Sequence, residues 1–218
     1  MAKYMIHACL DRLDYVQNYL IPSMIEQGID KYDILPYVDA DKEGCLVSCM
    51  KSFEIASEIP NGVWHIQDDV IICRDFKERT EKYDSGVVCG FSSYYDERKG
   101  WQPGDSNGLK MWYSFPCIRI STDIMREYVT WFNTYVWRDP QYENWIKAKK
   151  YDDTIFRIWM EQYHPQTYVL NLAPNLVDHV DYLLGGSTIN PSRKIKQVRS
   201  LSFADKDLVE ELERKLKK

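Results

Sequence analysis

The sequence predicts an α/β fold in a single domain, with a mixed, mainly parallel sheet flanked by helices. Strand and helix patterns alternate at short intervals through the first third of the chain, which is typical of a parallel sheet with helices on its faces. The chain also has 218 residues, of which 44% are hydrophobic. That length and composition suit one domain with a true core.

Three strands and two helices are predicted in this first third. The strands are Tyr4 to Leu10, Asp33 to Val38, and one that begins near Trp64 and ends at Asp68-Asp69. Apolar residues at helical spacing predict one helix from about Leu13 to Gly28, bent or restarted at Pro22, and another from about Glu43 to Ser57.

The segment from Ser92 to Trp112 is rich in polar and charged residues and has weak periodicity, so we expect a long surface loop. Its aromatic residues favour a binding lid rather than a disordered linker, although aromatic side chains that pin an ordered loop to the core give the same pattern. These residues are Tyr94, Tyr95, Trp101 and Trp112.

Helices dominate the predicted second half. Ser121 is a suitable cap for a helix whose buried face is Ile124, Tyr128, Trp131 and Tyr135. Another helix starts at Asp152-Asp153 and has Ile155, Ile158, Trp159 and Gln162 on one face. A strand is expected at Thr167 to Leu172, and a loop from Pro174 to His179. The last helix starts near Asp205, with Leu208, Leu212 and Leu216 on one side and a Glu211-Lys215 pair on the other.

Composition limits the classes of function. A formal charge of -5 argues against extensive nucleic-acid coating. No run approaches the ~20 apolar residues of a membrane span, and the N-terminus enters a strand pattern too soon for a secretory signal, so we expect a cytoplasmic protein. A basic cluster near the C-terminus could bind phosphate or could be a solvated loop. It contains Arg193, Lys194, Lys196 and Arg199.

The six cysteines lie mostly in apolar stretches and are interpreted as reduced core thiols. Cys45 and Cys49 are one helical turn apart, a spacing that can supply half a metal site. The sequence offers no histidine or second cysteine pair at zinc spacing to complete it, so a metal role for these thiols is not favoured.

Asp68 and Asp69 are the most informative residues, because a hydrophobic strand leads directly into two adjacent carboxylates. Such a pair is costly unless a cation, solvent or hydrogen-bond donors compensate the charge, and carboxylate oxygens suit Mg²⁺ or Mn²⁺. A strand that leaves the core through a polar turn is the alternative explanation. In open α/β sheets, ligands bind at the carboxyl ends of strands, which is where the pair lies.

Three features in this order resemble the GT-A glycosyltransferases, enzymes that use nucleotide sugars. They are Gln67-Asp68-Asp69-Val70 after a strand, Asp152-Asp153 at a helix start, and His179 in a late loop. The first half of that family is a Rossmann-like β-α-β-α-β unit that ends in a metal-binding Asp-x-Asp type motif. This chain departs from the motif because its first position is Gln67.

The resemblance implies a GT-A domain over residues 1–204, with a nucleotide-binding half in 1–91 and an acceptor half in 92–204, followed by a C-terminal helix in 205–218. It implies that Asp69 and His179 bind Mn²⁺ or Mg²⁺; a packing histidine is the alternative for His179. Expected donor-binding residues, for which a UDP-sugar is favoured, are Leu10, Arg12, Asp39, Lys51, Gln67, Asp68, Arg193 and Lys194. Asp39 fits a capped turn before a helix equally well.

Asp153, supported by Asp152, is the candidate general base, since a carboxylate near the acceptor hydroxyl can take its proton. Helix capping explains both residues equally simply. The expected function is transfer of a hexose from a nucleoside diphosphate sugar to a hydroxyl.

The chain is similar to phage and bacterial members of the family, including relatives of the DNA-base glucosyltransferases. A modified DNA base is therefore one acceptor candidate, for which Trp101, Trp112 and Tyr113 could stack on the extracted base. A glycan or a protein is the other. The alternatives to a glycosyltransferase are a nucleotide-binding module without transferase activity and a nucleotidyltransferase, which the missing Gly-rich phosphate loop disfavours.

Overall fold

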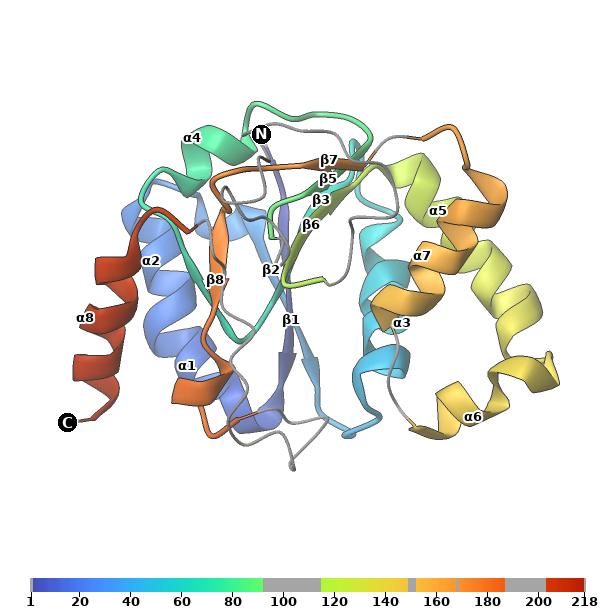
Figure 1. The fold of residues 1–218 in the computed structure, drawn as a ribbon, viewed down its shortest axis with the longest axis horizontal. Coiled ribbons are helices and arrows are strands. Elements are labelled where there is room, and N and C mark those ends of the chain that lie inside the picture. Colours follow the sequence, from blue (N-terminus) through green and yellow to red (C-terminus); the bar gives the residue numbers. More distant parts are fainter. Residues whose placement is uncertain (1, 92–114, 149–151, 168, 187–202, 218) are drawn as a thin grey trace, which may run out of the picture.

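A computed structural model describes residues 2–91, 115–148, 152–167, 169–186 and 203–217. They form one compact α/β domain in which helices cover both faces of a six-stranded sheet (Figure 1). The strand order is β2-β1-β3-β6-β5-β7, and β6 alone runs against the other strands of this sheet. The predicted mixed, mainly parallel sheet is therefore confirmed.

Eight strands are defined in the described residues. They are β1 (Tyr4–Cys9), β2 (Ile34–Asp39), β3 (Val63–Gln67), β4 (Val70–Ile72), β5 (Val87–Cys89), β6 (Cys117–Ile120), β7 (Val169–Asn171) and β8 (Val177–His179). Strands β4 and β8 form a separate antiparallel pair.

The α-helices are α1 (Leu13–Tyr15), α2 (Ile21–Glu26), α3 (Cys45–Ala56), α4 (Phe76–Thr80), α5 (Thr122–Trp131), α6 (Pro140–Ala148), α7 (Asp152–Tyr163) and α8 (Lys206–Leu216). Short 3-10 turns are η1 (Leu10–Arg12), η3 (Lys31–Asp33) and η7 (Asp181–Leu183), and π-helical turns are η2 (Val16–Leu20) and η6 (Phe132–Val136). None of these helices, which cover only the described part of the chain, has the length and apolar content to cross a bilayer.

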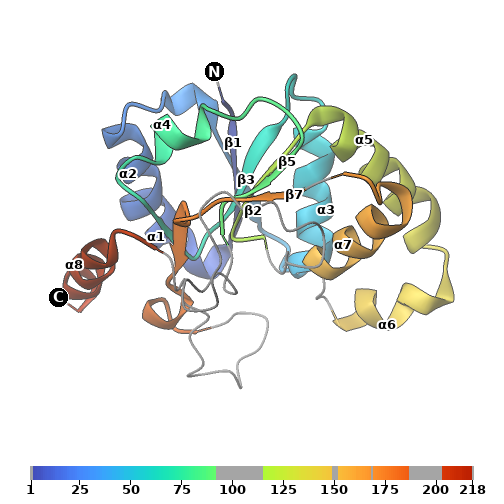
Figure 2. The same ribbon diagram turned by 45° about the horizontal axis from the view of Figure 1, so that its top comes forward.

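Alternation along the strands divides the core into two clusters. Tyr4, Ile6 and Ala8 of β1 face α1, α2 and α8, whereas Met5 faces α3, α5 and α7. Figure 2 shows the two helical layers on opposite sides of the sheet. Each face of the sheet is thus buried, which explains why its strands are so apolar.

Helices α5, α7 and α8 lie where the sequence predicts them, but some residues predicted on their buried faces are exposed. Tyr128 and Trp131 of α5 are buried, but Tyr135 is 57% exposed because η6 widens the last turn and rotates it away from the core. On α7, Trp159 is buried and Gln162 is exposed. On α8, Val209 is the most buried residue, and the predicted Glu211–Lys215 ion pair is present at 3.0 Å.

Three boundaries also differ from the prediction. Leu10 belongs to η1 and not to the first strand, and Asp33 ends η3 before β2 begins. Pro22 lies in the first turn of α2, directly after η2, so the helical run from Leu13 restarts there as expected. The expected loop from Pro174 to His179 contains strand β8, which pairs with β4. Strand β8 has only three residues, so it shows no periodic pattern in the sequence.

Gly62 precedes β3 at a position that admits no side chain. Its φ is +80°, and a Cβ there would lie 2.2 Å from the backbone oxygen of Ile120 in β6. Gly86, with φ of +72°, has nothing within 4 Å of the same position. A side chain at Gly86 would meet backbone strain alone, whereas a side chain at Gly62 would meet the same strain and a steric clash as well.

We predict that Gly62→Ala lowers the free energy of unfolding far more than Gly86→Ala does. The second change should cost about 1–2 kcal/mol, which is the strain of a left-handed backbone. The first must also displace the backbone of β6. Urea denaturation of both variants measures the difference, and equal losses would contradict the β3–β6 packing described.

Candidate functional site

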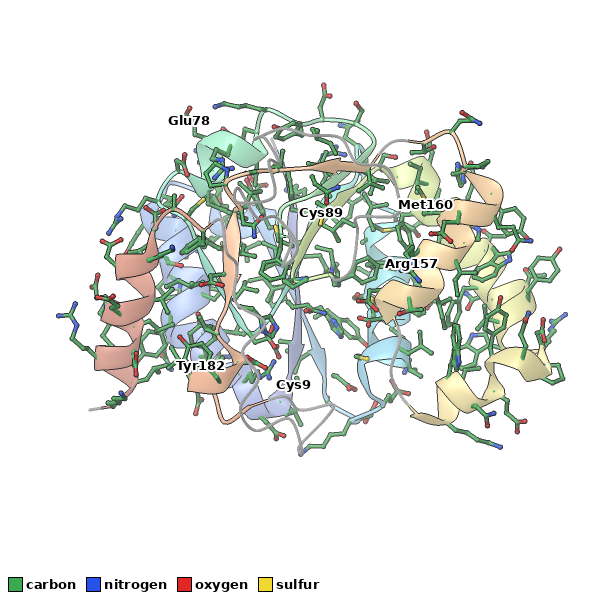
Figure 3. All side chains as sticks on the ribbon, in the orientation of Figure 1. Cys9, Glu78, Cys89, Arg157, Met160 and Tyr182 are labelled. Carbon is green, nitrogen blue, oxygen red and sulfur yellow. The ribbon has the colours of Figure 1, made fainter. Side chains whose placement is uncertain are left out.

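The strand order places a topological switch point at the carboxyl end of β1. The chain leaves β1 for β2 on one side and then crosses back to form β3 on the other, and both neighbours run parallel to β1. Such a topological switch point splays the connecting segments apart, and ligands of open α/β sheets bind there. Figure 3 labels Cys9, the last residue of β1, at this edge of the sheet, with Tyr182 of η7 nearby.

Asp68 and Asp69 directly follow β3, as predicted, in the turn that leads to β4, and both are buried. Only 6% of Asp68 and 7% of Asp69 is exposed, so solvent contributes little to balancing their charge. The backbone N–H of Cys9 donates to Asp68 Oδ2 at 2.7 Å. The main compensation must come from charged neighbours.

Arg12 supplies that compensation from η1, directly after β1. Its Nη1 lies 2.9 Å from Asp68 Oδ1 and also donates to Asp69 Oδ2, and its Nη2 donates to the carbonyl oxygen of Gly186 at 3.0 Å. Burial disfavours the guanidinium charge, but the two carboxylates outweigh it and raise the pKa of Arg12. Sequence reasoning identified Arg12 as a donor-binding residue and missed this ion pair, because η1 and the β3–β4 turn are adjacent only in the folded sheet.

His179 approaches the same acid pair from β8. Its Nε2 is 3.2 Å from Asp69 Oδ2, and its Nδ1 is 3.3 Å from Asp181 Oδ1. Burial lowers the pKa of His179, but Asp69 and Asp181 reverse this and raise it to about 10. Burial likewise opposes ionisation of Asp69, yet His179 and Arg12 hold the pKa of its carboxyl well below its usual range.

The contact between Asp69 and His179 was expected, whereas Asp181 was not. Strand β8 brings His179 into place by pairing Val70 with His179 beside the acid pair. Asp181 follows two residues later, at the start of η7. The sequence does contain a signal for Asp181, since it is an acid two residues after the candidate ligand His179. A carboxylate commonly orients the second ring nitrogen of a histidine ligand.

Asp69 and His179 fit a divalent cation as a pair of ligands. Asp69 Oδ1 is buried and has no hydrogen-bond partner among the residues that the structure describes. One carboxylate and one imidazole are ligand types that Mn²⁺ accepts, and Asp181 is placed to orient the imidazole. Cation binding has to displace a proton from His179 and compete with Arg12 for Asp69.

The other expected donor-binding residues have separate environments. Asp39 accepts the N–H groups of Glu43 (2.9 Å) and Gly44 (3.0 Å), so its carboxylate caps the turn before α3. Lys51 pairs with Glu43 at 2.5 Å. Leu10 is 41% exposed in η1, and Gln67 is the last residue of β3. Arg193 and Lys194 lie outside the described residues, as do the aromatic residues of the middle loop.

Asp152 and Asp153 begin α7, as predicted, and Asp152 is buried beside Cys45, the first residue of α3. Because α3 follows the carboxyl end of β2, these acids also lie at the carboxyl edge of the sheet. Burial and the adjacent Asp153 raise the pKa of Asp152 to about 7, and burial raises the pKa of Asp153. Across the described ranges, no hydrogen bond or ion pair joins them to Asp68 or Asp69.

Comparison with protein-family models gave no match, and neither did comparison with curated proteins.

We predict that Arg12→Met lowers the free energy of unfolding by about 3–5 kcal/mol, because it leaves two buried carboxylates without their cation. The same substitution in an Asp68→Asn, Asp69→Asn background should cost only a small part of that, since the charges to be compensated are gone. A double-mutant cycle by urea denaturation measures the coupling. If Arg12→Met costs the same in both backgrounds, Arg12 acts through packing alone.

Proposed function

We propose that this protein is a metal-dependent glycosyltransferase of the GT-A type, which moves a hexose from a nucleoside diphosphate sugar to a hydroxyl acceptor. The observation that carries the proposal is the convergence of Asp69 and His179 at 3.2 Å, beside Asp68, at the switch point between β1 and β3. These residues come from β8 and from the turn after β3, segments far apart in sequence.

The arrangement of the first half supports this proposal. The parallel strands β2, β1 and β3 and their connecting helices form a β-α-β-α-β unit, and the acid pair follows its last strand. The resemblance drawn from the sequence implies this order of elements. Many proteins with unrelated activities contain a parallel α/β unit, so the proposal depends on the residues of the site and not on the fold.

Asp69 and His179 would hold Mn²⁺ or Mg²⁺. Such a cation, when bound, supplies positive charge to the leaving diphosphate. Arg12 holds the Asp69 carboxylate through its Nη1, and Asp181 lies 3.3 Å from Nδ1 of His179, where it can orient the imidazole. Asp68, held by Arg12 and by the N–H of Cys9, is the candidate contact to the ribose or the sugar.

The proposed general base is Asp153, which is partly exposed at the start of α7, whereas Asp152 is buried behind it. Their raised pKa values suit proton transfer, since a base works best when its pKa is close to the working pH. Asp152 keeps one buried oxygen, Oδ2, without a hydrogen-bond partner within the described ranges. The candidate acceptors are a modified DNA base, a glycan or a protein.

One observation favours a second function, a nucleotide-binding module without transferase activity. Arg12 pairs with both acids and His179 supplies a second positive charge beside Asp69, so the acid pair is compensated without a metal. In that case the site at the switch point would bind nucleotide without requiring a divalent cation. The two functions therefore differ in their need for metal.

The first test incubates the protein with a panel of nucleotide sugars, beginning with UDP-sugars, and measures release of the nucleoside diphosphate with and without Mn²⁺. Hydrolysis is a side reaction that reports the donor without knowledge of the acceptor. We predict metal-dependent release that Asp69→Asn abolishes and Asp68→Asn reduces less. The control is Asp14→Asn, an exposed acid of α1. Wild-type release by Asp69→Asn, in metal-depleted buffer resupplied with Mn²⁺, would contradict the proposal.

The second test concerns the base. Asp153→Asn should lower the turnover number by roughly 10²–10⁴-fold while donor affinity changes little, because a general base acts in the transition state. Asp123→Asn is the matched control, since Asp123 is also an acid in the first turn of a helix, α5. If turnover per folded molecule is preserved in Asp153→Asn, the residue only caps the helix.

A further inference from the structure

A second group of ligand-type side chains lies inside the domain, between the sheet and α3, and the proposed function does not use it. It consists of His7 on β1, His65 on β3 and Cys49 on α3. One ligand atom from each lies within 4.8 Å of the other two. Cys49 and His65 are almost fully buried, and His7 is 8% exposed.

The spacing of strands and helix explains why these residues meet. Strands β1 and β3 are parallel neighbours in which Met5 pairs with His65, so His7 follows two residues later on the same face. Helix α3 packs on that face, and Cys49 belongs to its buried side. Cys49 therefore approaches both imidazoles from helix α3, which packs over the strands that carry His7 and His65.

Two serines of α3 lie beside the Nε2 atoms of both histidines. Ser48 Oγ is 2.9 Å from the carbonyl oxygen of Gly44 and 2.7 Å from His7 Nε2. Ser52 Oγ is 2.7 Å from the carbonyl oxygen of Cys49 and 3.5 Å from His65 Nε2. Each neutral imidazole has one ring nitrogen with a lone pair that can bind a cation.

Packing alone does not account for the cluster. His65 makes an edge contact with Phe53, with ring centroids 5.0 Å apart, as a buried aromatic residue would. Its Nδ1, however, is buried and has no hydrogen-bond partner among the described residues. A buried polar atom without a partner destabilises a core, so a bound group would relieve the cost.

We propose that His7, Cys49 and His65 form a zinc site that ties helix α3 to strands β1 and β3. Two imidazoles and a thiolate are typical zinc ligands, and ligand atoms around tetrahedral zinc are roughly 3.3–3.8 Å apart. The three ligand atoms lie within 4.8 Å of one another and move closer to reach this geometry. Zinc replaces the thiol proton of Cys49, which leaves to solvent.

Both imidazoles are suited to this role because burial keeps them neutral. Burial lowers the pKa of His7 to about 4, despite Asp39, and lowers the pKa of His65 well below its ordinary value. The sequence alone favoured no metal role for Cys49, since no histidine lies at zinc spacing. The partners come from two strands that precede and follow α3.

The test uses Co²⁺ as a spectroscopic substitute for Zn²⁺. Untagged protein is stripped of metal and titrated with Co²⁺, and we expect one equivalent to produce a thiolate-to-cobalt charge-transfer band with tetrahedral d–d bands. Zn²⁺ should then displace the cobalt. Cys49→Ser should abolish the charge-transfer band, whereas Cys117→Ser, which removes a buried thiol in the other core cluster, should keep it.

Asp69→Asn should also keep the band, so that failure of this site and failure of the proposed catalytic metal are distinguished. X-ray absorption at the cobalt edge of the wild-type protein needs no variant, and it should find one sulfur and two imidazole ligands. Absence of any charge-transfer band in the folded wild-type protein would overturn the proposal, as would retention of the band in Cys49→Ser.

Discussion

The ion pair between Arg12 and the carboxylates of Asp68 and Asp69 is the interaction on which the rest of the site depends. Two adjacent acids with less than a tenth of their surface exposed could not remain ionised without a buried cation. Arg12 can reach both because η1 and the β3–β4 turn follow neighbouring parallel strands. The same guanidinium binds the carbonyl of Gly186, so it also anchors the segment that follows η7.

His179 adds a second positive charge to this network, and its position follows from the small β4–β8 pair. Asp69 stands between Arg12 and His179, and Asp181 lies on the far side of the imidazole. Buried charges therefore alternate in sign along a continuous path. Such a network holds its side chains in fixed positions, which is what a site for a charged ligand requires.

The fold could be predicted from the sequence wherever a pattern was long and periodic. Strands β1, β2 and β3 and helix α3 fall within a few residues of their predicted ranges, because apolar alternation and helical spacing are local properties. Strand β8 was missed, since Val177–His179 is too short to show a period and depends on pairing with β4. The exposure of Tyr135 was missed because nothing local signals the π-helical turn η6.

The candidate site was predictable in its residue types and less so in its contacts. The acid pair after a strand and the meeting of Asp69 with His179 followed from motif order. The roles of Arg12 and Asp181, and the meeting of Cys49 with His7 and His65, required the strand order of the sheet. Charge pairing across strands is a property of the folded chain, and no spacing in the sequence encodes it.

Calorimetric titration with a panel of nucleoside diphosphates, in the presence and absence of Mn²⁺, tests the central claim most directly. If Asp69 and His179 form a metal-dependent nucleotide site, at least one nucleoside diphosphate should bind clearly more tightly with Mn²⁺ than without it. Equal affinity under both conditions, or no binding by any member of the panel, would contradict a metal-dependent nucleotide site at Asp69 and His179.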